Sequence, residues 1–496
     1  MPLSSSRSAP RETLLRASDL PSLAQLALGE GDVDGALELL AGLAAVEDHQ
    51  RRHWATLGLI DAGLAAATTI PAASRAQLLA GLADAALEAL EREPREPALL
   101  SRAGALLAEL GGHDAARALR TAASRLDPQL EAESKRAALR GRGLLAAGGG
   151  AIEPAHADLA QRAVAVAARA QPAEGMRLSL CMIVRNEQEM LPRCLAAVAD
   201  AVDEIVVVDT GSSDATVEIA RSFGARVIAH RWAGSFAEAR NVAFDAAGGD
   251  WLMYLDADEV LLAEDAALLR ALTGRTWREA FYLSETSYTG EIADGTAITH
   301  NALRIVRNRP EYRFEGRLHE QIAHRLPGYL PERIEATGIR IEHYGYLAAV
   351  SDGREKSRRN IELLRLQQAE APATPFLHYN LGCEYAAVGD VAAALGEFER
   401  SWELLQGREA GAGDQFTPAL IRRLAGALRA SGRPRDAVAL AGDRRDAALA
   451  GSCRCRPSPC SGVAARPSRC SLRTARWRAR GDRARSRPVP ARAGGR

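Results

Sequence analysis

Lysine is almost absent from this chain of 496 residues: only Lys135 and Lys356 occur, and arginine supplies the other basic side chains. Basic and acidic residues balance, 63 against 63, so the overall charge gives no indication of nucleic-acid binding. The chain has no run of about 18 apolar residues, and its first residues lack the apolar core of a signal peptide. We therefore expect a cytoplasmic protein without a transmembrane segment.

Cysteine is also scarce, with seven in the whole chain, and its placement excludes a secreted disulfide scaffold. Cys181, Cys194 and Cys383 lie in apolar patterns and are expected to be small core residues. The other four follow residue 450, where 13 arginines, one acid and no lysine occur without apolar periodicity. We expect 446–496 to be a disordered basic tail, with an out-of-frame reading of the gene as a second explanation.

Two regions are rich in alanine and leucine at helical spacing and contain few strand-forming residues. A glycine precedes an alanine by five positions at several turns between helical patterns. The clearest copy also has Leu381, Gly382 and Tyr385 before its glycine and Phe398 after its alanine. This pattern resembles the tetratricopeptide consensus of paired helices. It predicts all-α repeats over 21–172 and 355–445, after a disordered segment at 1–20; the alternative is a generic helical bundle. The paired positions are Gly31 and Ala36, Gly111 and Ala116, Gly389 and Ala394, and Gly432 and Ala437.

Between these regions, over 176–346, apolar strand-like runs alternate with helical patterns. This alternation predicts an α/β domain with a mostly parallel sheet. A helix is expected to begin at an N-cap of Ser213 or Asp214, and a polar link at 351–359 to lead into the second helical region. The predicted strands are 178–184, 204–209, 226–230, 251–255, 281–288, 302–307 and 339–344, and the main helices between the first four are 188–201, 214–223 and 235–247.

Polar residues lie at the carboxyl ends of three of the predicted strands. Asn186 and Glu187 follow the first, Asp209 ends the second, and Asp256 and Asp258 follow the fourth. Ligands of such sheets bind at the carboxyl ends of the strands. Side chains two apart in an extended segment point the same way, so Asp256 and Asp258 can converge on one divalent cation. The alternative for these two aspartates alone is a solvated acidic turn.

The ordered motifs resemble glycosyltransferase family 2. They are Leu180 to Glu187, Val206 to Asp214, Ala239-Arg240-Asn241 and Tyr254 to Glu259. The resemblance covers about 176–346 and implies a GT-A fold, an inverting reaction and a nucleotide-sugar donor. The helical repeats beside the domain resemble a subgroup of this family, some members of which modify peptides.

The resemblance also implies roles around the metal ion. Asp258 would be the principal ligand of Mn or Mg, which neutralises the leaving diphosphate. Asp256 would share the metal or contact the ribose. His343, at the end of a late strand, could complete the metal ligands, although a lone histidine there is more often structural.

Other residues would bind the donor. Asp209 would read the nucleoside, with Asn186 and Glu187 lining the same pocket. Arg240 could contact the diphosphate or orient Asp256, or could be an ordinary ion-paired arginine.

The general base that an inverting transfer requires is expected in Gly316-Arg-Leu-His319-Glu320. We expect Glu320 to be the base and His319 its neighbour or a contact to metal or diphosphate. Three other acids of the domain are expected to be solvated charges: Asp245, Asp265 and Asp294.

The expected function is therefore metal-dependent, inverting transfer of a sugar to a peptide, protein or cell-envelope glycan, with a UDP-sugar as the expected donor. A protein partner could bind the helical repeats. Two alternatives stay open. One is a sugar nucleotidyltransferase, although no glycine-rich loop follows the first strand. The other is a non-catalytic repeat scaffold with a degenerate α/β domain.

Overall fold

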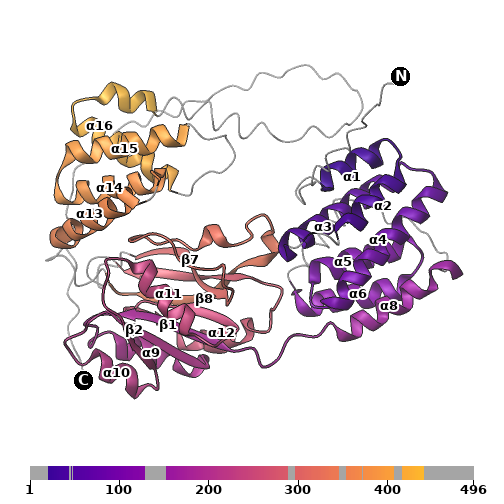
Figure 1. The fold of residues 1–496 in the computed structure, drawn as a ribbon, viewed down its shortest axis with the longest axis horizontal. Helices are drawn as coiled ribbons and strands as arrows, with labels where there is room; N and C mark the ends of the chain where they lie inside the picture. Colours follow the sequence, from indigo (N-terminus) through magenta and orange to yellow (C-terminus); the bar gives the residue numbers. More distant parts are fainter. Residues whose placement is uncertain are drawn as a thin grey trace, which may run out of the picture. The chain divides into compact units, whose positions relative to one another are not determined.

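The computed structural model shows helical regions and one large sheet (Figure 1). The chain divides into two compact units between Arg433 and Pro434, and the fold described below belongs to the first. The predicted tail at 446–496, residues 1–19 and Asp294 lie outside the described residues. The structure describes residues 20–43, 46, 48–128, 152–288, 297–345, 353–370, 372–406 and 416–440.

The first region is all-α in its described residues, as predicted. Its helices pack through leucines and alanines that form one continuous core. Close approach depends on small residues: a Cβ on Gly104 would lie 3.1 Å from the Ala116 carbonyl oxygen of the next helix. These helices are α1 (Leu20–Gly29), α2 (Val33–Gly42), α3 (His49–Ala66), α4 (Ala72–Arg92), α5 (Pro97–Glu109), α6 (His113–Leu126) and α8 (Ala157–Arg169).

The glycines of the repeat pattern lie at the turns between helices. Gly31, Gly111, Gly389 and Gly432 all have positive φ, between 75° and 89°. Only glycine adopts this conformation without steric cost, so it ends one helix and lets the next fold back. The alanine five residues later is buried in every copy, so a small side chain lies where each second helix packs.

The central region is an α/β domain around an eight-stranded sheet of order β3-β2-β1-β4-β7-β6-β8-β5. Four of the neighbouring pairs are parallel (β3–β2, β2–β1, β1–β4 and β6–β8) and the other three are antiparallel. The predicted α/β domain with a mostly parallel sheet is therefore confirmed. The strands are β1 (Leu178–Val184), β2 (Glu204–Asp209), β3 (Arg226–Ala229), β4 (Trp251–Tyr254), β5 (Glu259–Leu261), β6 (Ala280–Tyr288), β7 (Ala297–Arg307) and β8 (Ile334–His343).

Both faces of the sheet are covered by helices. Strands β1, β2 and β4 are mostly apolar and buried, and successive side chains point to opposite faces. Met182 and Met253 face a core shared with helices α9 (Leu191–Val198), α10 (Thr216–Ser222) and α12 (Ala266–Leu272). Cys181 and Leu252 face a second core, shared with α11 (Phe236–Ala246). This sandwich fixes the carboxyl ends of β1, β2 and β4 at one edge of the sheet.

Three details of the sequence-based prediction were wrong. Strand β5 begins at Glu259, directly after the two aspartates, where only a turn was expected. Helix α10 has Ala215 at its N-cap, although the Asp214 carboxylate accepts hydrogen bonds from the Thr216 backbone and side chain. The expected polar link at 351–359 is helical from Gly353 onward.

The last helical region follows the sheet domain. It comprises α13 (Gly353–Glu370), α14 (Pro375–Val388), α15 (Val391–Gln406) and α16 (Thr417–Ala430). Phe398 of α15 is 2% exposed and packs against Gly382 of α14. No helix among the described residues has the length and apolarity that a membrane span requires.

The contact between α14 and α15 leads to a stability prediction. A Cβ on Gly382 would lie 2.5 Å from the buried Phe398 ring, so Gly382→Ala forces that ring to move. We expect the free energy of unfolding to fall by about 1–3 kcal/mol, measured by urea denaturation. The matched control is Gly396→Ala, at an exposed position of α15 with open space, which should stabilise the helix by about 0.5–1 kcal/mol. Equal stabilisation by both changes would contradict the close packing.

Candidate functional site

The loops that follow β1 and β2 are bonded to each other. Asn186 has a left-handed backbone, with φ of 56°, which asparagine tolerates better than most residues. Its side-chain oxygen accepts a hydrogen bond from the Ser213 amide at 2.8 Å, and its own amide donates to the Ser212 hydroxyl at 2.9 Å. The Glu187 amide donates to Thr216 Oγ1 at 2.7 Å. The two strand ends therefore form one polar rim.

Asp209 ends β2 and shapes the turn that follows. Its carboxylate accepts hydrogen bonds from the Gly211 amide at 3.2 Å and the Ser212 amide at 3.1 Å. Gly211 has φ of 108°, so this turn requires glycine. Within the described residues, no hydrogen bond or ion pair joins Asp209 to another predicted site residue.

Arg240 joins two of the predicted residues. It lies on α11, and its Nη2 donates to Asp256 Oδ1 at 2.8 Å while its Nε donates to Glu320 Oε1 at 2.5 Å. The guanidinium lies near the rings of Tyr254 and Phe314, 5.4 and 5.6 Å from their centres. The sequence suggested that Arg240 could orient Asp256, and the geometry agrees with that option.

The two sides of this ion pair differ in exposure. The Arg240 side chain is 9% exposed, whereas that of Asp256 is 44% exposed. Burial opposes ionisation of Asp256, but the positive charges of Arg240 and Arg304 outweigh it and lower the pKa of this carboxyl. Asp256 is thus an ionised carboxylate that is held from the inside and open to a ligand from the outside.

Asp258 lies beside His343, the last residue of β8. His343 pairs with Glu259 across the antiparallel β5–β8 ladder, which brings its side chain to the aspartate. Its Nε2 is 3.5 Å from Asp258 Oδ2, and its Nδ1 is 3.2 Å from Glu285 Oε1. Burial acts to lower the pKa of His343, yet Asp258 and Glu285 raise it to about 10.

Three residues to which the sequence assigned no role support this pair. Arg304 of β7 bonds both Glu259 and Glu285, the latter at 2.8 Å. Glu259 is 1% exposed, and its carboxylate accepts a hydrogen bond from the Asp256 amide at 3.0 Å. Glu285 and Arg304 lie in the interior of long strands, where a charged residue gives no sequence signal until the register is known.

The donor atoms at this place fit a hard divalent cation. Glu259, Glu285 and His343 offer ligand atoms within 4.8 Å of one another. Because Arg304 already bonds both glutamates, Asp258 and His343 Nε2 are the better candidates for ligands, with Glu285 holding the other ring nitrogen. Negative charge also accumulates: burial, together with Asp258 and Asp256, raises the pKa of Glu187 to about 7. A cation would relieve this repulsion.

The loop with the predicted base is a closed turn. Backbone hydrogen bonds in both directions join Glu315 and Gln321, at 2.9 and 2.8 Å. Glu320 faces Arg240, as described above. His319 faces Glu384 of α14, with Nε2 3.9 Å from its carboxylate. No hydrogen bond or ion pair in the described part of the chain joins His319 to Asp256 or Asp258.

The expectation that Asp265 is a solvated charge was wrong. Asp265 is 4% exposed and accepts hydrogen bonds from the backbone and side chain of Arg340, each at 2.9 Å. These bonds lower the pKa of its carboxyl and fix the end of β5 beside β8. Asp245, by contrast, is 65% exposed and pairs with Arg313 at the surface.

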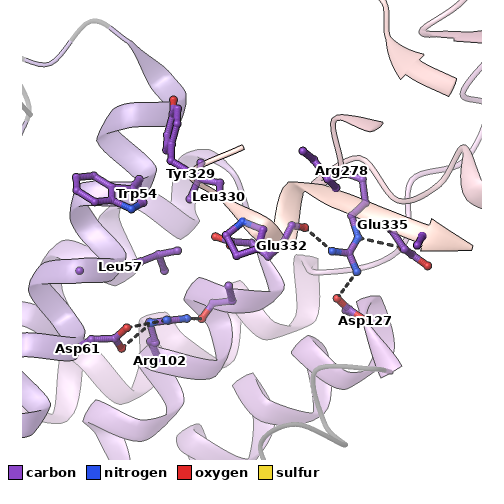
Figure 2. Close-up of a pocket in the computed structure, with 15 residues that line it drawn as sticks. Trp54, Leu57, Asp61, Arg102, Asp127, Arg278, Tyr329, Leu330, Glu332 and Glu335 are labelled. Atoms are coloured by element: carbon purple, nitrogen blue, oxygen red, sulfur yellow. Dashed lines mark hydrogen bonds and ion pairs between the residues drawn. The ribbon is translucent and has the colours of Figure 1, made fainter. Parts of the chain in front are cut away.

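A separate cavity of about 610 Å³ lies where α3 and α5 meet residues 329–336. Figure 2 shows Arg278 between Asp127 and Glu335, and Arg102 beside Asp61. The Arg278 guanidinium lies 2.8 Å from the Asp127 carboxylate and 3.0 Å from that of Glu335, and Arg102 is 2.7 Å from Asp61. None of the predicted site residues lines this cavity. Its charges pair with each other and connect the first helical region to the sheet domain.

Comparison with known proteins agrees with this geometry. Residues 179–319 match the family model described as glycosyl transferase family 2. A TPR repeat-containing protein of Synechococcus elongatus is 39% identical over 225 residues, which cover 44% of this chain and 54% of that protein. The prophage-derived glycosyltransferase SunS of Bacillus subtilis is 29% identical over 203 residues, covering 38% of this chain and 44% of that protein. The chain thus spans about half the length of the curated relatives it matches.

Among solved structures, residues 1–349 of S. aureus TarS in complex with UDP are 16% identical, with a TM-score of 0.30. That similarity covers 53% of this chain and 83% of the TarS chain. Glucosyl-3-phosphoglycerate synthase of Mycobacterium tuberculosis in complex with Mn²⁺ and UDP-glucose is 22% identical, with a TM-score of 0.20 over 22% of this chain and 44% of that one. The family match and the sheet together support one conclusion: residues 179–319 of this chain form a domain of glycosyl transferase family 2.

Proposed function

We propose that this protein transfers a sugar from a nucleotide-diphosphate donor, with a UDP-sugar as the expected one, to an acceptor, with inversion. One observation carries the proposal, and it concerns the two aspartates that follow β4. Arg240 bonds both Asp256 and Glu320, and His343 lies beside Asp258. In such a site, Asp256 and Asp258 would bind the sugar donor and its metal, and the separate carboxylate of Glu320 would act on the acceptor.

The nucleoside end of the donor is assigned to the rim formed after β1 and β2. The rim contains Asn186, Glu187 and Asp209. Hydrogen bonds from the Asn186 and Glu187 amides join the loop after β1 to the segment that follows β2, and Asp209 accepts a bond from the backbone of its own loop. Backbone that is already fixed loses little entropy when a ligand binds. This rim and the two aspartates share one edge of the sheet, where ligands of parallel sheets bind.

The metal is assigned to Asp258 and His343, with Asp256 as a further ligand or a ribose contact. A bound Mn²⁺ or Mg²⁺ would neutralise charge on the leaving diphosphate. The chain's own contribution is to hold the ligands still: Glu285 orients the His343 ring, and Glu259 holds the Asp256 backbone.

The general base is assigned to Glu320. Its side chain is 13% exposed, and one carboxylate oxygen accepts from Arg240, which orients the group. The second oxygen is then the atom that would take the acceptor proton. His319, with φ of 53°, is placed beside it as a neighbour that shapes the loop. Arg240 fixes the distance between this base and Asp256.

The acceptor is proposed to be a peptide, a protein or a cell-envelope glycan. The helical regions predicted at 21–172 and 355–445 flank the domain predicted at 176–346, and repeat surfaces of paired helices commonly bind peptide segments. The relative from Synechococcus elongatus is named for such repeats, and SunS is named a glycosyltransferase. A protein partner on these helices is the second option for their use.

The site leads to a prediction about two carboxylates. With Mn²⁺ and a panel of UDP-sugars, we expect the full chain to release UDP slowly with water as acceptor. Asp258→Asn should reduce this rate by at least about 100-fold through the lost metal ligand. Glu320→Gln should reduce it by about 100-fold or more through the lost base, while UDP binding by calorimetry stays unchanged.

Asp245→Asn is the matched control, because Asp245 is an exposed acid on the helix that carries Arg240. It should behave as the unchanged protein. Full activity of Asp258→Asn would contradict the metal assignment. Absence of UDP binding, with or without metal, would favour the non-catalytic scaffold instead.

A second prediction concerns the pH dependence of metal binding. The pKa of His343 is raised to about 10, so at neutral pH its ring carries the proton that a metal must displace. Raising the pH removes that proton, so Mn²⁺ affinity should rise by up to about tenfold per pH unit between about pH 6.5 and 8.5. Calorimetry in two buffers of different ionisation enthalpy should show the released proton.

The control is His343→Gln, which cannot release this proton. Its binding should be weaker, and its dependence on pH should be shallower by about one proton. Equal pH dependence in both proteins would show that His343 does not bind the metal.

A further inference from the structure

The loop that carries Glu320 lies against the helices that follow the sheet domain. Leu318 packs on a buried cluster formed by Leu364 of α13 with Leu377 and Leu381 of α14. An apolar side chain two residues before a proposed catalytic carboxylate is thus partly shielded from water by a region that the family match at 179–319 does not include. This contact makes the two helices part of the surroundings of the site.

Arg317 and helix α13 make a set of polar contacts in the same place. The Arg317 guanidinium donates to both carboxylate oxygens of Glu370, at 2.7 and 2.6 Å. Its backbone amide donates to Gln367 Oε1 at 2.7 Å. A two-pronged contact of this kind fixes direction as well as distance. The backbone of the loop is therefore tied to α13 at the residue three positions before Glu320.

Arg317 also reaches the helix that carries Arg240. Its Nη1 donates to the carbonyl oxygens of Ala233 and Gly234, at 3.2 and 3.0 Å. Its own carbonyl accepts from the amide of Phe236, the first residue of α11, at 2.9 Å. One residue thus connects α13 to the start of the helix whose arginine holds both Asp256 and Glu320.

The conformation of the loop explains why it needs such support. Among the described residues, Asn186 and His319 are the non-glycine residues with left-handed φ. Gly316 in the same loop has φ of 99°, and a Cβ there would lie 3.5 Å from the Gln367 side chain. Strained backbone of this kind persists only where the surroundings hold it. Here the surroundings are the Glu315–Gln321 bridge on one side and α13 and α14 on the other.

We propose that α13 and α14 act as a positioning element of the active site, holding residues 316–320 so that Glu320 stays on Arg240. Gln367 and Glu370 are the positioning residues, and they act through Arg317. This inference rests on the proposed function for the role of Glu320. The second helical region would then support the active site, in addition to any binding of an acceptor or partner.

Hydrogen exchange of the full chain tests the mechanical part of the proposal without any assay of activity. We expect Gln367→Ala combined with Glu370→Gln to raise amide exchange in 315–321 and 233–236. Strands β1 and β2 should exchange as before. Glu362→Gln is the matched control, an exposed glutamate on the same helix, and it should change neither segment. Unchanged exchange at 315–321 in the double variant would overturn the proposal.

Kinetics test the functional part, with UDP release from a UDP-sugar and water as acceptor. The Gln367→Ala, Glu370→Gln double variant should lower kcat by about tenfold while UDP affinity and KM for the donor stay unchanged. In the Glu320→Gln background the same two changes should have little further effect, since they act through Glu320. A full additional loss in that background would show a general structural effect and overturn the positioning role.

The failures are distinguishable. If the unchanged protein binds no UDP, the proposed function fails, and hydrogen exchange still decides whether α13 holds the loop. If UDP is bound and released but both kinetic constants of the double variant match those of Glu362→Gln, only the positioning role fails.

Discussion

The candidate site depends on the ion pairs of Arg240. A buried guanidinium is stable only when its charge is compensated, and here two carboxylates from distant parts of the chain compensate it. Asp256 comes from the end of β4 and Glu320 from a loop more than sixty residues later. Because the two share one cation, neither can move without disturbing the other. The two ion pairs therefore fix the spacing between the Asp256 and Glu320 carboxylates.

A second network of charges surrounds Asp258 and His343. Arg304 lies between Glu259 and Glu285, and these glutamates hold the Asp256 backbone and the His343 ring in turn. Burial raises the pKa of Glu259 despite the positive charge of Arg304. At Glu285, the hydrogen bond from His343 and the charge of Arg304 outweigh burial and lower the pKa. The negative charge that remains open, on Asp256 and Asp258, is directed to the edge where a ligand can enter.

Much of the fold was readable from the sequence, for physical reasons. Alternating strands and helices determined the parallel half of the sheet, and left-handed glycines such as Gly111 and Gly389 marked the helical turns. Strand β5 was missed because three residues after an acidic turn carry too little pattern. The solvated role expected for Asp265 was wrong because its partner Arg340 is 75 residues away. In the site, the spacing of the motifs predicted Asp256 and Arg240 as site residues. Glu285, Arg304 and Arg317 act through tertiary contacts, which a local sequence pattern cannot predict.

The central claim is that Asp256, Asp258 and His343 form a metal-assisted nucleotide-sugar site beside a base held by Arg240. Anomalous diffraction from crystals of the full chain with Mn²⁺ and UDP tests it most directly. The account predicts a manganese peak bonded to the Asp258 carboxylate and His343 Nε2, with the diphosphate on its open side. A peak bound by Glu259 and Glu285 in place of Arg304, or UDP bound elsewhere with no manganese at this edge of the sheet, would contradict it.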